Sequence, residues 1–226
     1  MRLALVIVVG LTLAASLASP SQAANVSAPH HVDGAAPSDP ALESLLFPNV
    51  DLDGLRAKGP AVLPALARLY ERSDESRRAV IAYAFYGLGW KSPEAKRVLI
   101  ADVHTPNRDL RLQVQWALGR VSSDTDVVDI LLDNMQHDDN PLFRDKAACA
   151  LANDQIHLTP AQKVHLFERL IRAMRDPKPD VRAIASLALE IQTGQTKGFN
   201  ANAPEASREA TVRVWERWLD TYRANL

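Results

Sequence analysis

The chain has 226 residues, which is enough for one domain with a sizeable hydrophobic core. Hydrophobic residues make up 47% and charged residues 23%, and only 9 glycines are present, a composition that favours a globular helical protein. The formal net charge is −1 with acids and bases intermixed, which argues against nucleic acid as a partner. The single cysteine excludes an intramolecular disulfide.

The first segment, residues 1–23, has the pattern of a secretory signal peptide. It carries one positive charge at Arg2, an apolar run that ends near Leu17, and small residues before a cleavage point after Ala23. We therefore expect a secreted or periplasmic protein with no membrane span after cleavage. The alternative is an uncleaved anchor that tethers the protein, but the run is shorter than the roughly 20 residues of a spanning helix.

The next segment, residues 24–40, is rich in Ala, Pro, Ser and Asp and shows no hydrophobic period, which predicts a flexible linker. His30 and His31 lie in it without the other ligands that a closed metal site needs. Residues 41–226 then form the folded domain, and residues 41–58 are expected to cap its N-terminal end.

A repeat runs through the middle of this domain. Four arginines, spaced by 33, 33 and 38 residues, begin similar stretches: Arg78, Arg111, Arg144 and Arg182. Three residues after each arginine stand Ile81, Val114, Ala147 and Ala185; six after stand Ala84, Ala117, Ala150 and Ala188; seven after stand Phe85, Leu118, Leu151 and Leu189. These offsets share one helical face, and a fixed period of this length indicates stacked helical units.

A second amphipathic helix precedes each arginine helix. We expect these helices at residues 61–72, 93–104, 125–137 and 160–175. Thr159 with Gln162, and Ser123 with Asp126, have the spacing of a capping box. Each unit is therefore predicted to be a helical hairpin.

The arginine helices resemble HEAT repeats of the PBS-lyase type, whose second helix typically reads D-x-x-V-R-x-x-A-A-x-A-L-G. The stretches 107–119 and 178–189 match this motif best, and the resemblance covers about residues 60–193. It implies an all-α, right-handed α-solenoid of about four HEAT-like hairpins with capping helices at both ends. In that family an acid and the arginine join one repeat to the next, and we call this series of contacts the arginine ladder. The positions aligned with the acid are Asp74, Asn107, Asn140 and Lys178. Because the last of them is a lysine, the resemblance implies a weaker ladder at the last unit.

The C-terminal stretch resembles the end of many exported bacterial HEAT-repeat proteins. A Thr-Gly-Gln turn at 193–195 and a Gly-Phe pair at 198–199 precede a helix with Trp215 and Trp218. Val212, Trp215, Leu219 and Tyr222 fall on one stripe of that helix, with Trp218 beside it. A helix at about 203–224 is therefore predicted to cap the last repeat, as solenoids require.

Few residues indicate catalysis. The chain has no His-Glu dipeptide of the kind found in iron-binding HEAT enzymes, and no nucleophile, phosphate-loop or zinc-protease motif. His104 and His137 occupy equivalent helix ends, where a cation is favourable without a metal. Cys149 lacks a neighbouring base and is expected to be inert. We expect no catalytic residue, metal or cofactor.

The remaining candidate is a binding face on the second helices, which line the concave side of such solenoids. Tyr83, Gln113, Trp116, Arg120 and Lys146 lie at offsets that the core pattern does not use. Aromatic residues and arginine are enriched at binding hot spots. We expect a non-catalytic scaffold that binds a protein or peptide there. The alternative is an accessory enzyme or lyase-like factor, suggested by the family resemblance.

Overall fold

The computed structural model describes residues 39–152 and 156–226, and in these ranges the chain forms helices and no strand. The predicted signal peptide, His30, His31 and nearly all of the predicted linker lie outside the described residues. The helices in chain order are α1 (Pro40–Glu43), α2 (Leu52–Ala57), the 3-10 helix η1 (Pro60–Val62), α3 (Leu63–Arg72), α4 (Glu75–Leu88), α5 (Pro93–Ala101), α6 (Arg108–Val121), α7 (Thr125–His137), α8 (Pro141–Ala152), α9 (Pro160–Ala173), α10 (Pro179–Thr193) and α11 (Glu205–Ala224).

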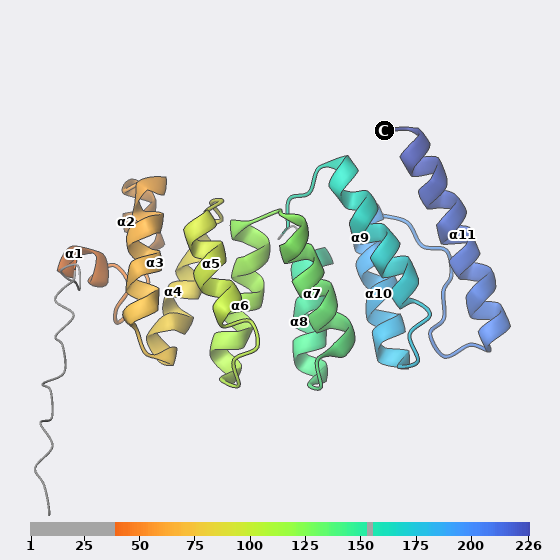
Figure 1. Ribbon diagram of the computed structural model, residues 1–226, viewed down its shortest axis with the longest axis horizontal. Helices are drawn as coiled ribbons and strands as arrows, with labels where there is room; N and C mark the ends of the chain where they lie inside the picture. The colour runs from red at the N-terminus through yellow and green to blue at the C-terminus, as the bar shows by residue number, and fades with distance from the viewer. Residues whose placement is uncertain (1–38, 153–155) are drawn as a thin grey trace, which may run out of the picture. The chain divides into compact units, whose positions relative to one another are not determined.

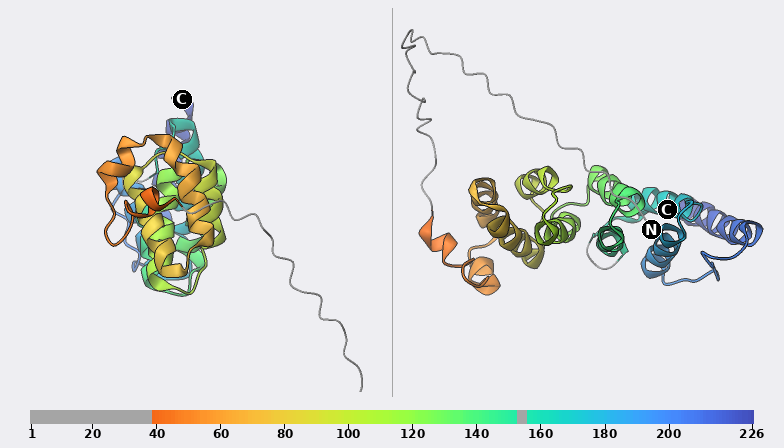
Figure 2. Two further views of the ribbon diagram at one scale, coloured as in Figure 1. Left: turned by 90° about the vertical axis from the view of Figure 1, so that its left-hand side faces the viewer. Right: turned by 90° about the horizontal axis from the view of Figure 1, so that it is seen from below.

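Four hairpins stack side by side in the part of the chain from α3 to α10 (Figure 1). The first helices of the hairpins, α3, α5, α7 and α9, form one layer, and the second helices, α4, α6, α8 and α10, form the other (Figure 2). Successive second helices pack on one another throughout, whereas α5 and α7 are not among the closely packed pairs of first helices. The predicted all-α solenoid is therefore confirmed.

Burial explains the repeat pattern. The residues three, six and seven positions after each repeat arginine are all buried. Alanine at the sixth offset lets successive second helices approach closely, and the larger residue beside it fills the space between the units. The arrangement gives one continuous core that no hairpin would bury alone.

The helix ends follow capping chemistry with two departures from the prediction. Thr159 and Gln162 form the predicted capping box at α9. The box predicted at Ser123 and Asp126 is absent, because the N-cap of α7 is Asp124 rather than Ser123. The first helices also end earlier than predicted in two hairpins, so that His104 lies beyond α5 rather than in its last turn.

The repeat arginines join successive units, but through other acids than those predicted. Arg78 pairs with Asp102 at 3.3 Å, Arg111 with Asp138, and Arg144 with Asp180. The aligned positions Asp74 and Asn107 instead cap their own helices by accepting a backbone N–H. Asn107 also joins two units, as predicted, because its Nδ2 donates to Glu75 of the preceding unit at 3.0 Å. The acids that pair with the arginines differ from the prediction and come from the following unit.

Both ends of the stack carry additional helices. At the N-terminal end, α2 packs on α4, and Leu42, Leu46 and Leu55 are buried. At the C-terminal end, α11 packs on α9 through buried Trp215, while Trp218 lies edge-on to Phe167 at a ring separation of 5.3 Å. The predicted stripe of the C-terminal helix thus forms its packed face.

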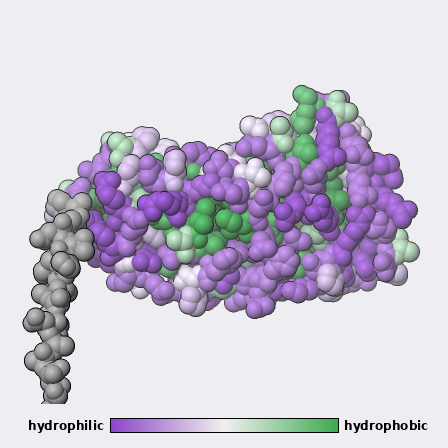
Figure 3. Space-filling view, viewed as in Figure 1, coloured by the Kyte–Doolittle hydropathy of each residue, from purple (hydrophilic) through white to green (hydrophobic). Residues whose placement is uncertain are grey.

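The surface of the described part is mostly polar. Figure 3 shows this for the face that carries the first helices, with a hydrophobic patch near its middle. Among the described residues, no helix combines the length and the apolar character needed to cross a membrane.

Candidate protein-binding face

The predicted binding residues lie on the layer of second helices. We call the following set the second-helix row: Tyr83, Gln113, Trp116, Arg120, Lys146, Cys149, Ile184, Leu187 and Ile191. Tyr83 is on α4, three members are on α6, two on α8 and three on α10. Because α4, α6, α8 and α10 pack in that order, the row crosses all four units.

The row is exposed where it is most apolar. Large hydrophobic side chains that are exposed in the described part of the chain are Tyr83 (41%), Leu187 (56%), Ile191 (46%), Val214 (37%) and Leu226 (61%). The first three belong to the row, and the other two belong to α11 and the C-terminus. No described terminal segment covers these three side chains.

An aromatic cluster occupies the first half of the row. The ring of Tyr86 lies 6.5 Å from that of Tyr83 and 6.1 Å from that of Trp116. Trp116 is half-buried and packs on the core with one part of its ring. The cluster joins α4 to α6, so these rings have a fixed mutual arrangement rather than the freedom of isolated surface side chains.

Arg120 lies over this cluster. Its guanidinium group is 5.4 Å from the centre of the Tyr86 ring, and its Nε is 3.4 Å from the Tyr86 carbonyl oxygen. Gly89 ends α4 in the left-handed conformation, and a Cβ there would lie 3.3 Å from Arg120 Nε. Glycine at this position therefore serves both the helix end and the close approach of Arg120.

The middle of the row is more polar. The Oε1 atom of Gln113 is buried, and no hydrogen-bond partner for it lies within residues 39–152 or 156–226. Lys146 donates to Asp145 at 2.8 Å, and this contact raises the pKa of the lysine. Burial is the main cause that raises the pKa of the Cys149 thiol, which lowers its thiolate fraction at neutral pH.

Lys91 lies just beyond α4 and is exposed. Burial and the charge of Arg120 both lower the pKa of Lys91, while Asp124 acts in the opposite direction. Asp124 itself forms an ion pair with Lys96 at 2.7 Å, and Lys96 also binds Asp126. Two cations, Lys91 and Arg120, therefore lie within electrostatic reach of each other at the edge of the aromatic cluster.

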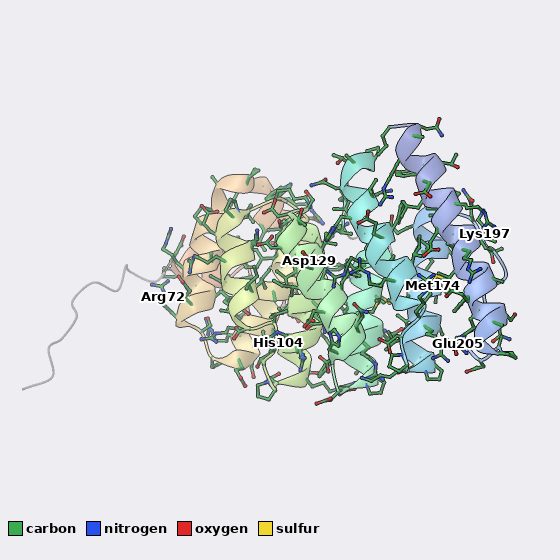
Figure 4. The ribbon with its side chains drawn as sticks, turned by 45° about the vertical axis from the view of Figure 1, so that its right-hand side comes forward. Arg72, His104, Asp129, Met174, Lys197 and Glu205 are labelled. Carbon is green, nitrogen blue, oxygen red and sulfur yellow. The ribbon has the colours of Figure 1, made fainter. Side chains whose placement is uncertain are left out.

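The two equivalent histidines lie at a separate surface pocket of about 340 Å³, at the edge where first and second helices connect. His104 marks this edge in Figure 4, and the pocket also contains Arg111. His137 is the last residue of α7 and lies 2.8 Å from Asp133. In the described ranges, no three His, Cys, Asp or Glu residues are arranged to hold a metal ion.

Sequence reasoning missed Tyr86 and Lys91. Tyr86 stands eight residues after Arg78, where the other units have Gly119, Ala152 and Glu190. The other units hold a small or polar residue at this position, so the aromatic residue in the first unit could have singled out Tyr86. Lys91 lies after the helix, outside the periodic pattern, and gave none.

The comparison with protein-family models agrees with the helical-hairpin fold. Residues 64–152 match the family model described as HEAT repeats, and no curated protein matches the chain. A similar solved chain comes from the complex of CpcE and CpcF of phycocyanin lyase from Nostoc sp. PCC7120. The two chains are 18% identical, the match covers 69% of this chain and 98% of that chain, and the TM-score is 0.43. Residues 64–152 are thus similar to HEAT repeats, and the stacked hairpins make the described domain an all-α solenoid.

Proposed function

We propose that this protein is a non-catalytic interaction module that binds a segment of another protein across the second-helix row. The observation that carries this proposal is the exposure of Tyr83, Leu187 and Ile191 in one row of a mostly polar protein. Leu187 and Ile191 are neighbours on α10, one helical turn apart, and an exposed apolar patch of this kind marks an interaction site.

The composition of the row supports the same function. Its exposed and half-buried members include tyrosine, tryptophan and arginine, the residue types that dominate binding energy at interfaces. Trp116 and Arg120 are held by contacts to Tyr86, so a partner would order few new side chains when it binds. Stacked repeats provide an extended surface of this kind.

The proposed site of action is the periplasm or the extracellular space. Support comes from the sequence of residues 1–23, with one positive charge, an apolar run and small residues before the cleavage point. Sequencing the N-terminus of exported protein tests this proposal. A chain that begins at Ala24 supports it, and one that begins at Met1 contradicts it.

The alternative, an accessory enzyme or lyase-like factor, requires titratable groups that converge in a pocket. The groups whose pKa values depart most from their ordinary values are Tyr70, Arg175 and Glu209. Each of them contacts a charged side chain of another helix and so joins elements of the fold. No contact in the described residues favours catalysis over binding.

Capture of a partner from the exported protein fraction tests the proposed function. The bait proteins are the wild type, Leu187→Asp, and Val214→Asp as a matched control on α11. Both substitutions replace an exposed apolar side chain by the same charge, so both variants should fold. We expect the wild type and Val214→Asp to capture the same protein and Leu187→Asp to lose it. Equal capture by all three, or no specific capture, would contradict the proposal.

A further inference from the structure

We infer that the partner contacts the α10 end of the second-helix row with an amphipathic α-helix that lies along α10. This helix covers Ile184, Leu187 and Ile191, and one of its basic side chains faces Glu190. The inference rests on the proposed function and adds the secondary structure and the charge of the bound segment.

The first step is the spacing of the apolar residues on α10. Leu187 follows Ile184 by three residues and Ile191 follows Leu187 by four, so the three side chains form one stripe along the helix axis. Leu187 and Ile191 are exposed, and Ile184 is half-buried. At the rise of an α-helix the stripe is about 10 Å long. Helix α10 therefore has one apolar face in the core and a second that reaches the surface.

The second step concerns the conformation of the bound segment. Isoleucine, leucine and isoleucine at spacings of three and four are typical of positions a, d and a in helices that pack in pairs. An extended segment on the same stripe would remove its own backbone N–H and C=O groups from water. The described part of the chain has no strand edge that could pair with those groups. A helix bonds them internally, so a helix covers the stripe without that penalty.

The third step is the charge beside the stripe. Glu190 is half-buried and occupies position g of the same pattern, which lies on the flank of a paired helix. Its Oε1 accepts from the hydroxyl groups of Ser186 and Thr196, each at 3.3 Å, and no cation among the described residues binds it. At the N-terminal end of the stripe, the carboxylate of Asp180 is already paired with Arg144. Glu190 therefore offers a carboxylate to a lysine or arginine on the flank of the partner helix.

Two display libraries of peptides with blocked ends test this inference. In the first, random residues occupy one face and its two flanks on a helix-forming background of alanine and glutamine. In the second, the same number of random residues alternates with threonine and proline, which prevents a helix. The targets are the wild type, Leu187→Asp and Glu190→Gln. The controls Val214→Asp and Glu94→Gln make the same replacements at exposed positions on α11 and α5, and circular dichroism checks that every target is folded.

We expect binders of the wild type from the helical library alone. They should carry large apolar residues three and four positions apart and an excess of lysine or arginine on one flank. Their affinity should fall about tenfold or more for Leu187→Asp, because an apolar contact is lost and a charge is buried in its place. Glu190→Gln should weaken binding about threefold, as expected for a partly exposed ion pair. Both control variants should bind as the wild type does.

Four results would overturn the inference: binders from the extended library as often as from the helical one, no binder from either library, binders with no basic excess, or unchanged affinity for Leu187→Asp and Glu190→Gln. If Leu187→Asp still abolishes capture of the native partner in any of these cases, the proposed function stands and only the helical docking is wrong. If Leu187→Asp has no effect on capture, the proposed function itself fails.

Discussion

The guanidinium group of Arg182 donates two hydrogen bonds to the carbonyl oxygen of Ala201, from Nε at 3.0 Å and from Nη2 at 2.6 Å. The preceding repeat arginines pair with carboxylates of the following unit. No repeat unit follows Arg182, and the loop between α10 and α11 takes its place. The ladder thus ends on a neutral backbone group, which fixes the loop that leads to the capping helix.

Arg182→Ala should therefore destabilise the C-terminal end of the stack. Arg182 is buried and also donates to the carbonyls of Asp176 and Pro177. Removing a buried donor group with several acceptors should lower the free energy of unfolding by about 2–4 kcal/mol. Urea unfolding measures the change, with Arg217→Ala as an exposed control. A loss no larger than that of the control would show that Arg182 does not hold the loop.

Acid should loosen α11 before the central helices. Two hydrogen bonds from Arg175, at 2.6 and 2.8 Å, lower the pKa of Glu209 to about 2 from its ordinary 4.5. Because the folded-state pKa lies below the unfolded value, this contribution is complete above pH 4.5 and is lost as the pH falls from 4.5 toward 2. Amide exchange in α11 should rise in this range more steeply in the wild type than in Glu209→Gln. Identical pH profiles would remove Glu209 from this account.

Alkali should weaken the contact between the first two units. Burial and a 2.7 Å hydrogen bond to Asp102 raise the pKa of Tyr70 well above its ordinary 10.0. A raised folded-state pKa gives stability that is complete below pH 10 and is lost above it, as the unfolded chain ionises. The free energy of unfolding should therefore fall more steeply above pH 10 in the wild type than in Tyr70→Phe. Parallel curves would contradict this assignment.

Gln115→Leu should stabilise the protein. Gln115 is fully buried, and neither polar atom of its amide has a hydrogen-bond partner among the described residues. The equivalent positions in the other units hold the small residues Ala82, Ala148 and Ser186. Replacing an unsatisfied amide by an apolar side chain of similar size should raise the free energy of unfolding by about 1 kcal/mol. A decrease on thermal or urea unfolding would show that the amide is satisfied in solution.

The sequence predicts the core of this fold well, because the core depends on local periodicity. Offsets three, six and seven from each repeat arginine share one face of an α-helix, and that face is buried in every unit. The partners of the arginines were not predictable in the same way. Asp102 and Asp138 lie outside the aligned motif, and whether they reach an arginine depends on how two units pack.

The candidate site was predictable only in part. The periodic offsets placed Tyr83, Trp116 and Arg120 on one layer, and the structure brings them together through Tyr86. Whether these three residues are exposed depends on which other segments pack over the second helices. The periodic pattern within one helix carries no information about that packing. The charge environment of Lys91 likewise depends on contacts between the end of α4 and α6.

Site-specific photocrosslinking from the second-helix row tests the central claim most directly. A photoreactive residue at position 187, in the full-length protein expressed in its own cells, is compared with one at position 214 on α11. Both positions are exposed in the free protein. According to the proposal, the bound partner covers position 187 and leaves position 214 uncovered. The account predicts one specific crosslinked protein from position 187 and none in common from position 214. The same crosslinks from both positions, or none from position 187, would contradict it.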